Sequence, residues 1–151
     1  MNLTYKDLMF MDLVEGDSSF ENQFGNIGGE GHYRGVLVSD ILELVGSMTE
    51  GDLLIITSTD GYQQEFGYLN AYPDDLWFAL QGHMIVALEF DGVMAPAWAD
   101  GPRVVMIPDD GLYSNSDCEI TSYEGQGFSV YESAGARWVR NTLTIKVEAS
   151  A

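Results

Sequence analysis

The stretch that decides the fold runs from Met84 to Pro108 and reads MIVALEFDGVMAPAWADGPRVVMIP. It begins and ends with apolar runs of strand length, MIVAL and VVMI. Asp91-Gly92 follows the first run, and this dipeptide is typical of a tight hairpin turn because both of its positions adopt a positive φ. Uninterrupted apolar runs indicate strands that are buried on both faces. We therefore expect residues 84–90 and 103–107 to form adjacent strands in the core.

The segment between the two runs is predicted to be a loop. It contains Pro96-Ala97-Trp98-Ala99-Asp100-Gly101-Pro102, which has too many strand breakers to belong to a sheet. One basic residue, Arg103, stands at the start of the second run. The pattern therefore places an arginine at the edge of the core, beside a loop.

Length and composition favour one acidic, strand-rich domain. The 151 residues give room for one domain with a real core, and we expect a single domain over 1–151. A formal charge of −18 makes nucleic acid and anionic membrane unsuitable partners, since both are negatively charged. The charge favours an acidic, soluble surface. Clustered carboxylates that bind a cation are the alternative.

The few basic residues restrict where an anion can bind. Only six residues are Lys or Arg, and none lies between Gly35 and Pro102. An anionic ligand therefore requires the arginines of the last third of the chain to converge. Cys118 is the only cysteine, so no intrachain disulfide can form. No apolar run is long enough to span a bilayer, which predicts no membrane insertion.

The chain starts almost directly on predicted structure, which suggests an exported protein whose leader has been removed. We therefore expect an extracytoplasmic location.

Local signals predict the remaining elements. Short helices are expected after Thr4, after Ser39 or Asp40, and after Pro73, from capping residues and from glycine stops such as Gly46. A second hairpin is expected over 52–69. The remaining expectations are a long loop over 14–31 that contains at most one short strand, a strand over 128–131 and a C-terminal strand over 137–147.

Five pieces of the sequence, in this order, resemble the oxidoreductase molybdopterin-binding domain. This is the fold of sulfite oxidase and of the catalytic subunit of the bacterial methionine-sulfoxide reductase system. The pieces are Tyr33–Val36 with the helix that follows, Thr57–Tyr62, Ala87–Gly92, Gly101–Pro108, and Arg137–Val139 with the last strand. The resemblance implies an α+β, β-rich fold, here a reduced, single-domain version of the sulfite oxidase-like molybdopterin-binding fold.

The resemblance also implies a ligand-binding cleft. In the family the cofactor lies where the loop before the aromatic-x-Gly-Val segment meets loops that carry basic residues. The corresponding residues here are Tyr33, Asp60, Tyr62, Arg103 and Arg137. Arginines bind phosphate and pyrophosphate through forked hydrogen bonds, and tyrosines supply flat walls. The alternatives are that the arginines pair with acidic neighbours and that Asp60 only makes its turn.

One departure from the family decides the functional prediction. The family's enzymes ligate molybdenum through a cysteine before the aromatic-x-Gly-Val segment, and residues 15–34 contain none. We therefore expect a non-catalytic or degenerate module that binds a pterin or another small anionic ligand. No cofactor is expected in the isolated protein, although the resemblance implies molybdopterin. The alternatives are an active molybdenum-cofactor oxidoreductase, with Cys118 or no thiolate as ligand, and an acidic cell-surface structural domain.

Overall fold

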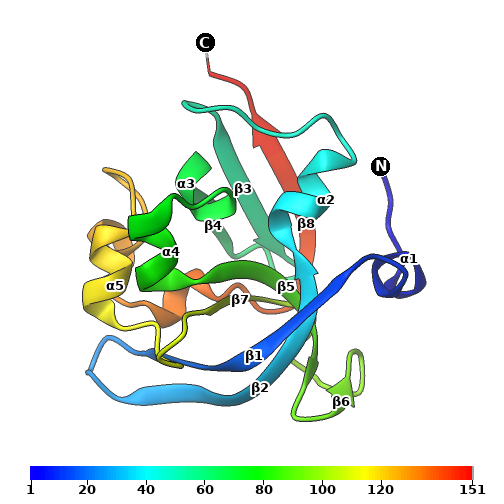
Figure 1. Cartoon of the computed structure of the whole chain (residues 1–151), viewed down its shortest axis with the longest axis horizontal. Coiled ribbons are helices and arrows are strands. Elements are labelled where there is room, and N and C mark those ends of the chain that lie inside the picture. Colours follow the sequence, from blue (N-terminus) through cyan, green and yellow to red (C-terminus); the bar gives the residue numbers. More distant parts are fainter. Residues whose placement is uncertain (151) are drawn as a thin grey trace.

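The computed structural model describes residues 1–150 and is a sheet-rich mixture of strands and helices (Figure 1). All strand pairs are antiparallel, and they form two sheets. The strands are β1 (Leu13–Glu21), β2 (Ile27–Leu37), β3 (Leu53–Ser58), β4 (Gln63–Phe66), β5 (His83–Phe90), β6 (Val93–Met94), β7 (Arg103–Ile107) and β8 (Thr142–Glu148). This confirms the predicted β-rich α+β class.

The larger sheet is organised around β5. Strand β2 pairs with one edge of β5, and β7 and β6 pair with the other edge. The predicted pairing of the two apolar runs is confirmed, with Ile85 opposite Val105. Asp91 and Gly92 have φ values of 49° and 83°, so they make the tight turn that leads from β5 into β6. Both apolar runs are buried except for Ile107, which is half-buried at the end of β7.

The smaller sheet has the order β4-β3-β8. Its first two strands form the hairpin predicted over 52–69. The inward side chains of β3 and β4 join those of the larger sheet in one hydrophobic cluster, which includes Leu54, Ile56 and Phe66. The two sheets therefore share one core.

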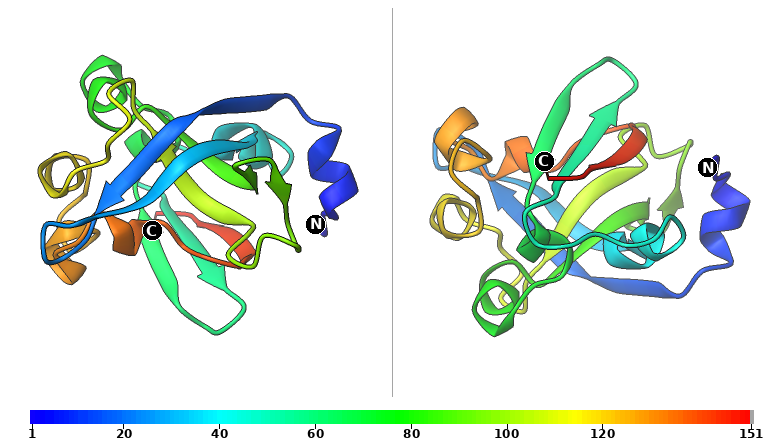
Figure 2. Two further views of the ribbon diagram at one scale, coloured as in Figure 1. Left: turned by 90° about the horizontal axis from the view of Figure 1, so that it is seen from below. Right: turned by 90° about the horizontal axis from the view of Figure 1, so that it is seen from above.

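Short helices flank the sheets. They are α1 (Tyr5–Met9), α2 (Val38–Glu43), α3 (Tyr68–Ala71), α4 (Asp75–Gln81), α5 (Asn115–Ile120), α6 (Phe128–Tyr131) and the 3-10 turn η1 (Gly135–Arg137). Figures 1 and 2 show α1 at one end of the molecule and α4 and α5 at the other. The three predicted helices are confirmed as α1, α2 and α4. The predicted cap of α2 is wrong, because its N-cap is Leu37, which has no side-chain hydrogen bond.

The prediction of a long loop over 14–31 is wrong. These residues form most of the hairpin of β1 and β2, although glycine is rare in strands. A Cβ at Gly28 or Gly29 would lie within 3 Å of the Phe20 ring, and one at Gly31 would clash with Phe90. The glycines thus make room for aromatic rings that lie against the strands, which local propensity does not reveal.

Two predictions near the C-terminus also need correction. Residues 128–131 form helix α6 and not a strand, between Gly127 and Glu132, which both have positive φ. A run of four residues is too short for its periodicity to distinguish strand from helix. The predicted strand over 137–147 begins only at Thr142. It is broken by η1 and by Asn141, whose φ is 45°.

Candidate functional site

A cavity of about 660 Å³ lies where the β3–β4 turn meets the chain before β7 and the segment before β8. We call it the arginine pocket, after Arg103 and Arg140 in its lining. Its other charged lining residues are Asp60 and Asp100. Aromatic side chains complete the walls; they are Phe20, Phe24, Tyr62, Tyr131 and Trp138.

The guanidinium group of Arg103 is fixed by the protein itself. Arg103 is the first residue of β7, and its Nε donates to the carbonyl oxygen of Trp138 at 3.1 Å. Its Cζ lies 5.2 Å from the centre of the Phe20 ring and 5.7 Å from that of Trp138. Burial lowers the pKa of Arg103, but an arginine remains charged in proteins. The pocket therefore contains a cation that is oriented before any ligand arrives.

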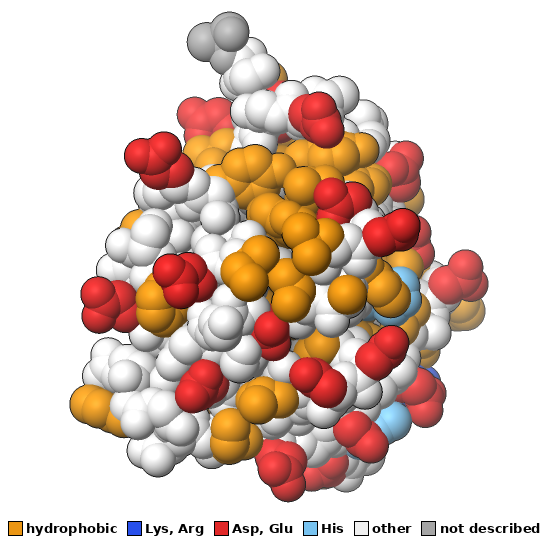
Figure 3. Space-filling model, turned by 60° about the vertical axis from the view of Figure 1, so that its left-hand side comes forward, with side chains coloured by type: hydrophobic (Ala, Val, Ile, Leu, Met, Phe, Trp, Pro, Cys, Tyr) orange, Lys and Arg blue, Asp and Glu red, His pale blue; other side chains and the backbone are white. Residues whose placement is uncertain are grey.

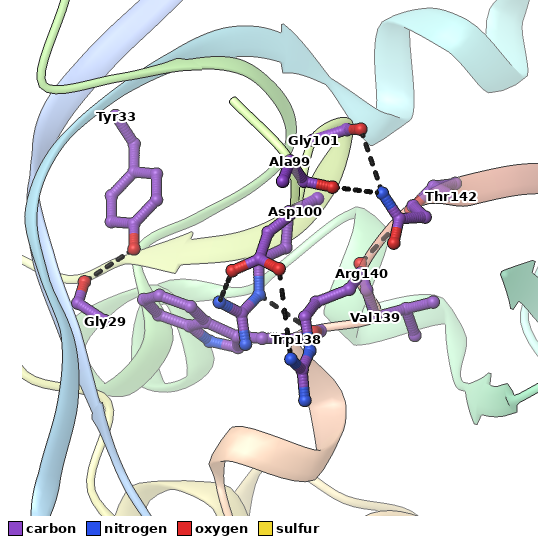
Figure 4. Close-up of polar contacts among 11 residues, drawn as sticks. Gly29, Tyr33, Ala99, Asp100, Gly101, Trp138, Val139, Arg140 and Thr142 are labelled. Carbon is purple, nitrogen blue, oxygen red and sulfur yellow. Dashed lines mark hydrogen bonds and ion pairs between the residues drawn. The ribbon is translucent and has the colours of Figure 1, made fainter. Parts of the chain in front are cut away.

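Asp100 lies between the two arginines, and Figure 4 shows its carboxylate beside Arg140. Its carboxylate oxygens are 3.8 Å from Nη1 of Arg103 and 3.9 Å from Nη1 of Arg140. Both distances exceed hydrogen-bond length, so these are loose ion pairs. The loop that carries Asp100 is held by Asn141, whose Nδ2 donates to the carbonyl oxygens of Ala99 and Gly101. The guanidinium groups therefore keep N–H donors for another acceptor.

Asp60 and Tyr62 belong to the turn between β3 and β4 and also line the pocket. The hydroxyl of Ser58 and the backbone N–H of Tyr62 donate to the Asp60 carboxylate, and they lower its pKa. Tyr62 donates its hydroxyl to the carbonyl oxygen of Ala136 at 2.7 Å. Asp60 thus stabilises the turn between β3 and β4, which was the alternative to a role in ligand binding. These hydrogen bonds hold both Asp60 and Tyr62 in a fixed position at the pocket.

Tyr33 and Arg137 do not line the pocket. Tyr33 is 1% exposed, and its hydroxyl donates to the carbonyl oxygen of Gly29 (Figure 4). Burial raises the pKa of Tyr33 to about 12. Arg137 is fully buried, with its Cζ 4.0 Å from the centre of the Phe66 ring. Of the five residues predicted for the cleft, the structure brings together Asp60, Tyr62 and Arg103.

The sequence reasoning missed several residues of the pocket. Arg140 belongs to the same C-terminal group of basic residues as Arg137, and sequence alone does not decide which one reaches the pocket. Asp100 follows the tryptophan of the breaker-rich loop. Phe20 and Phe24 lie in the segment that was predicted to be a loop, so their approach depends on the β1–β2 hairpin. Of these residues, only Arg140 and Asp100 could have been suggested as pocket residues from the sequence, because they lie close to the ends of predicted strands.

Cys118 does not fit the role of a molybdenum ligand. Its side chain is fully buried in α5 and does not line the arginine pocket. Burial raises the pKa of the Cys118 thiol, which disfavours the thiolate that a metal would need. Within residues 1–150, no three His, Cys, Asp or Glu side chains are arranged to hold a metal ion. The pocket could accommodate the anionic part of a pterin cofactor, but it offers no thiolate.

The surface of the molecule is acidic. Figure 3 shows one face, on which carboxylate side chains surround gathered hydrophobic side chains and basic side chains are scarce. None of the helices in residues 1–150 combines the length and apolar character needed to cross a membrane. No protein-family model matches the chain, and no curated protein matches it.

Proposed function

We propose that this chain is a non-catalytic or degenerate member of the molybdopterin-binding fold and binds a pterin or another small anionic ligand in the arginine pocket. The observation that carries the proposal is the loose pairing of the two guanidinium groups with Asp100. Arg103 and Arg140 contact their shared carboxylate only at 3.8 and 3.9 Å. An anion with two or more oxygen atoms can form shorter, charge-assisted hydrogen bonds with these donors.

The charge distribution supports an anion at this position. The chain carries 24 acidic and only 6 basic residues, so an anion is repelled over most of the surface. Two of the basic residues line this one cavity. Asp100 competes with the ligand for both of them, but its loose contacts make it a weak competitor.

The walls of the pocket favour a flat anion, such as a pterin that carries a phosphate or carboxylate. Tyr62 and Tyr131 are tilted against each other with ring centres 5.9 Å apart, and Phe24 is largely exposed at the cavity. Exposed aromatic rings beside fixed donors are typical of sites for planar ligands. The volume of about 660 Å³ lies within the range of small-molecule sites.

A binding experiment tests the proposal. Pterin-6-carboxylate and inorganic pyrophosphate are titrated into the full chain at low salt, with calorimetry as the readout. We expect binding of at least one probe, which Arg140→Met weakens about tenfold, the effect of one lost charge-assisted hydrogen bond. Arg34→Met is the matched control, because Arg34 pairs with Glu89 at 3.5 Å and does not line the pocket.

The outcome also decides between this proposal and a purely structural role. Equal weakening by both variants would indicate a general charge effect and contradict a specific site. The absence of binding at millimolar concentrations of both probes would favour an acidic cell-surface structural domain.

Elemental analysis tests the non-catalytic part of the proposal separately. We expect no stoichiometric molybdenum in protein purified from a host that makes the cofactor, because residues 15–34 lack cysteine and Cys118 is buried. One molybdenum atom per chain would instead favour an active molybdenum-cofactor oxidoreductase.

A further inference from the structure

A second cavity, of about 880 Å³, lies beside strand β8 and has a different character. We call it the β8 groove. Its walls come from the chain before and within α1, from α2 and the residue Val45, from the loop over 96–102, and from residues 141–145. None of its lining side chains is charged, although charged residues make up 20% of the chain. Leu143 and Val45 remain 64% and 58% exposed there.

The groove meets the edge of β8 and not only one face of the strand. Both Thr144 and Ile145 line it, although successive side chains of a regular strand point to opposite faces. Strand β8 pairs only with β3, so its other edge has no neighbouring strand in residues 1–150.

Hydrogen bonding in the smaller sheet determines which backbone groups face outward. The N–H of Ser58 donates to the carbonyl oxygen of Tyr62, so Ser58 bonds on the side of β4. Because the bonding side alternates along a strand, Thr57 and Ile55 bond on the side of β8. Their partners there are Thr144 and Lys146. The N–H and C=O groups of the intervening Ile145 therefore point away from β3, and the same holds for Val147.

These outward groups of β8 have no hydrogen-bond partner among the described residues. Other sheet edges are covered at least in part. On β4, the carbonyl oxygen of Glu65 accepts from Arg137. On β1, Ser19 and Glu21 exchange backbone hydrogen bonds with Tyr113. An uncovered edge beside an apolar groove is a template for a further strand.

We propose that the β8 groove binds an extended peptide segment of a partner protein, which adds to the sheet as a strand beside β8. The main chain of the peptide pairs with Ile145 and Val147, and alternate apolar side chains fill the groove. A segment of about five residues spans about 17 Å at the usual rise of a strand, enough to cover residues 143–147.

The charge of this protein favours a peptide that carries basic residues on both sides of its apolar segment. The side chains that line the groove are uncharged, but the groove belongs to a molecule of formal charge −18, so Lys and Arg flanks of the peptide are attracted to its surroundings. The same charge disfavours a second copy of this chain, because edge-to-edge pairing would bring two strongly acidic molecules together.

Two substitutions at Ile145 isolate the main-chain contact. Ile145→Pro removes the outward N–H while leaving the hydrogen bonds of Thr144 and Lys146 to β3 intact, and proline is tolerated on edge strands in this orientation. Ile145→Ala removes a similar amount of side chain but keeps the N–H, so it is the matched control. Thermal unfolding followed by circular dichroism checks that both variants fold alike.

The experiment selects binders of the full chain from a random 12-residue peptide library displayed on phage. We expect enriched peptides with alternating apolar residues, basic flanks and no proline in the centre. A synthetic copy of the best peptide should bind Ile145→Pro at least about tenfold more weakly than Ile145→Ala. In hydrogen exchange, the Ile145 and Val147 amides should exchange fast in the free protein and become protected by the peptide.

Each other outcome overturns the proposal. Enriched peptides that bind both variants equally would place the contact elsewhere. Self-association in sedimentation experiments, lost in Ile145→Pro, would assign the edge to a second copy. Binding of an uncharged apolar dye to the groove without protection of either amide, and without any peptide selected, would assign it to a small apolar ligand.

Discussion

Arg137 provides the most direct test of how this core is held together. Its guanidinium is fully buried, and none of its hydrogen-bond acceptors is a carboxylate. Nη1 donates to Oε1 of Gln64 and to the carbonyl oxygen of Glu65, and Nη2 donates to Oδ1 of Asn70 at 3.2 Å. The perturbation is Arg137→Met, which keeps an unbranched side chain but removes all of these donors.

The expected loss of stability follows from these contacts. Oδ1 of Asn70 still accepts from the N–H of Gly67, so the substitution leaves two acceptors, Oε1 of Gln64 and the carbonyl oxygen of Glu65, without the Arg137 donor. Each unsatisfied buried acceptor costs about 1–3 kcal/mol. The buried methionine and the removal of a desolvated charge offset part of this cost. We therefore expect Arg137→Met to lower the free energy of unfolding by about 3–5 kcal/mol, the usual effect of breaking a buried charged network.

Urea unfolding followed by tryptophan fluorescence and circular dichroism measures this loss. Arg140→Met is the control, because the Arg140 side chain is 65% exposed and makes only the contact of 3.9 Å with Asp100. It should change the free energy of unfolding by no more than about 0.5 kcal/mol. A loss below about 1 kcal/mol for Arg137→Met, with an unchanged urea slope, would refute the view that this network stabilises the core.

Two further predictions concern the larger sheet. Val105→Asp should abolish folding, since it places an unpaired carboxylate opposite Ile85 at a fully buried position. The loss of dispersed amide signals in NMR spectra measures this, and a spectrum typical of a folded protein would contradict it. His32 lies 2.8 Å from the Asp17 carboxylate and 3.2 Å from that of Glu15, and these contacts raise its pKa, with Asp17 the largest cause. Protonated His32 therefore stabilises the folded state fully below the pKa of about 6.5 that histidine has in the unfolded chain. This stabilisation is lost as the pH rises through the higher pKa of His32 in the folded state. Urea unfolding of the chain and of His32→Gln should differ more at pH 5.5 than at pH 9, by less than about 1 kcal/mol because the pair is exposed; an equal difference at both pH values would show that the ion pairs contribute nothing.

The sequence by itself determined those elements whose signals are local. The two apolar runs and the Asp91-Gly92 turn predicted β5, β7 and the turn after β5, because burial on both faces and positive φ restrict the residue types at each position. Capping residues predicted α1, and alternation with a turn predicted the hairpin of β3 and β4. The scarcity of basic residues limited any anion site to the arginines.

Tertiary structure decided what depends on contacts between distant segments. The glycines of residues 14–31 form strands because the rings of Phe20 and Phe90 occupy the space beside them, and no local pattern encodes that contact. Arg137 and Arg140 are three residues apart, yet η1 and the positive φ of Asn141 bury one and leave the other at the pocket. The uncovered edge of β8 likewise arises only from the strand order, because a strand's own sequence does not determine which neighbours cover it.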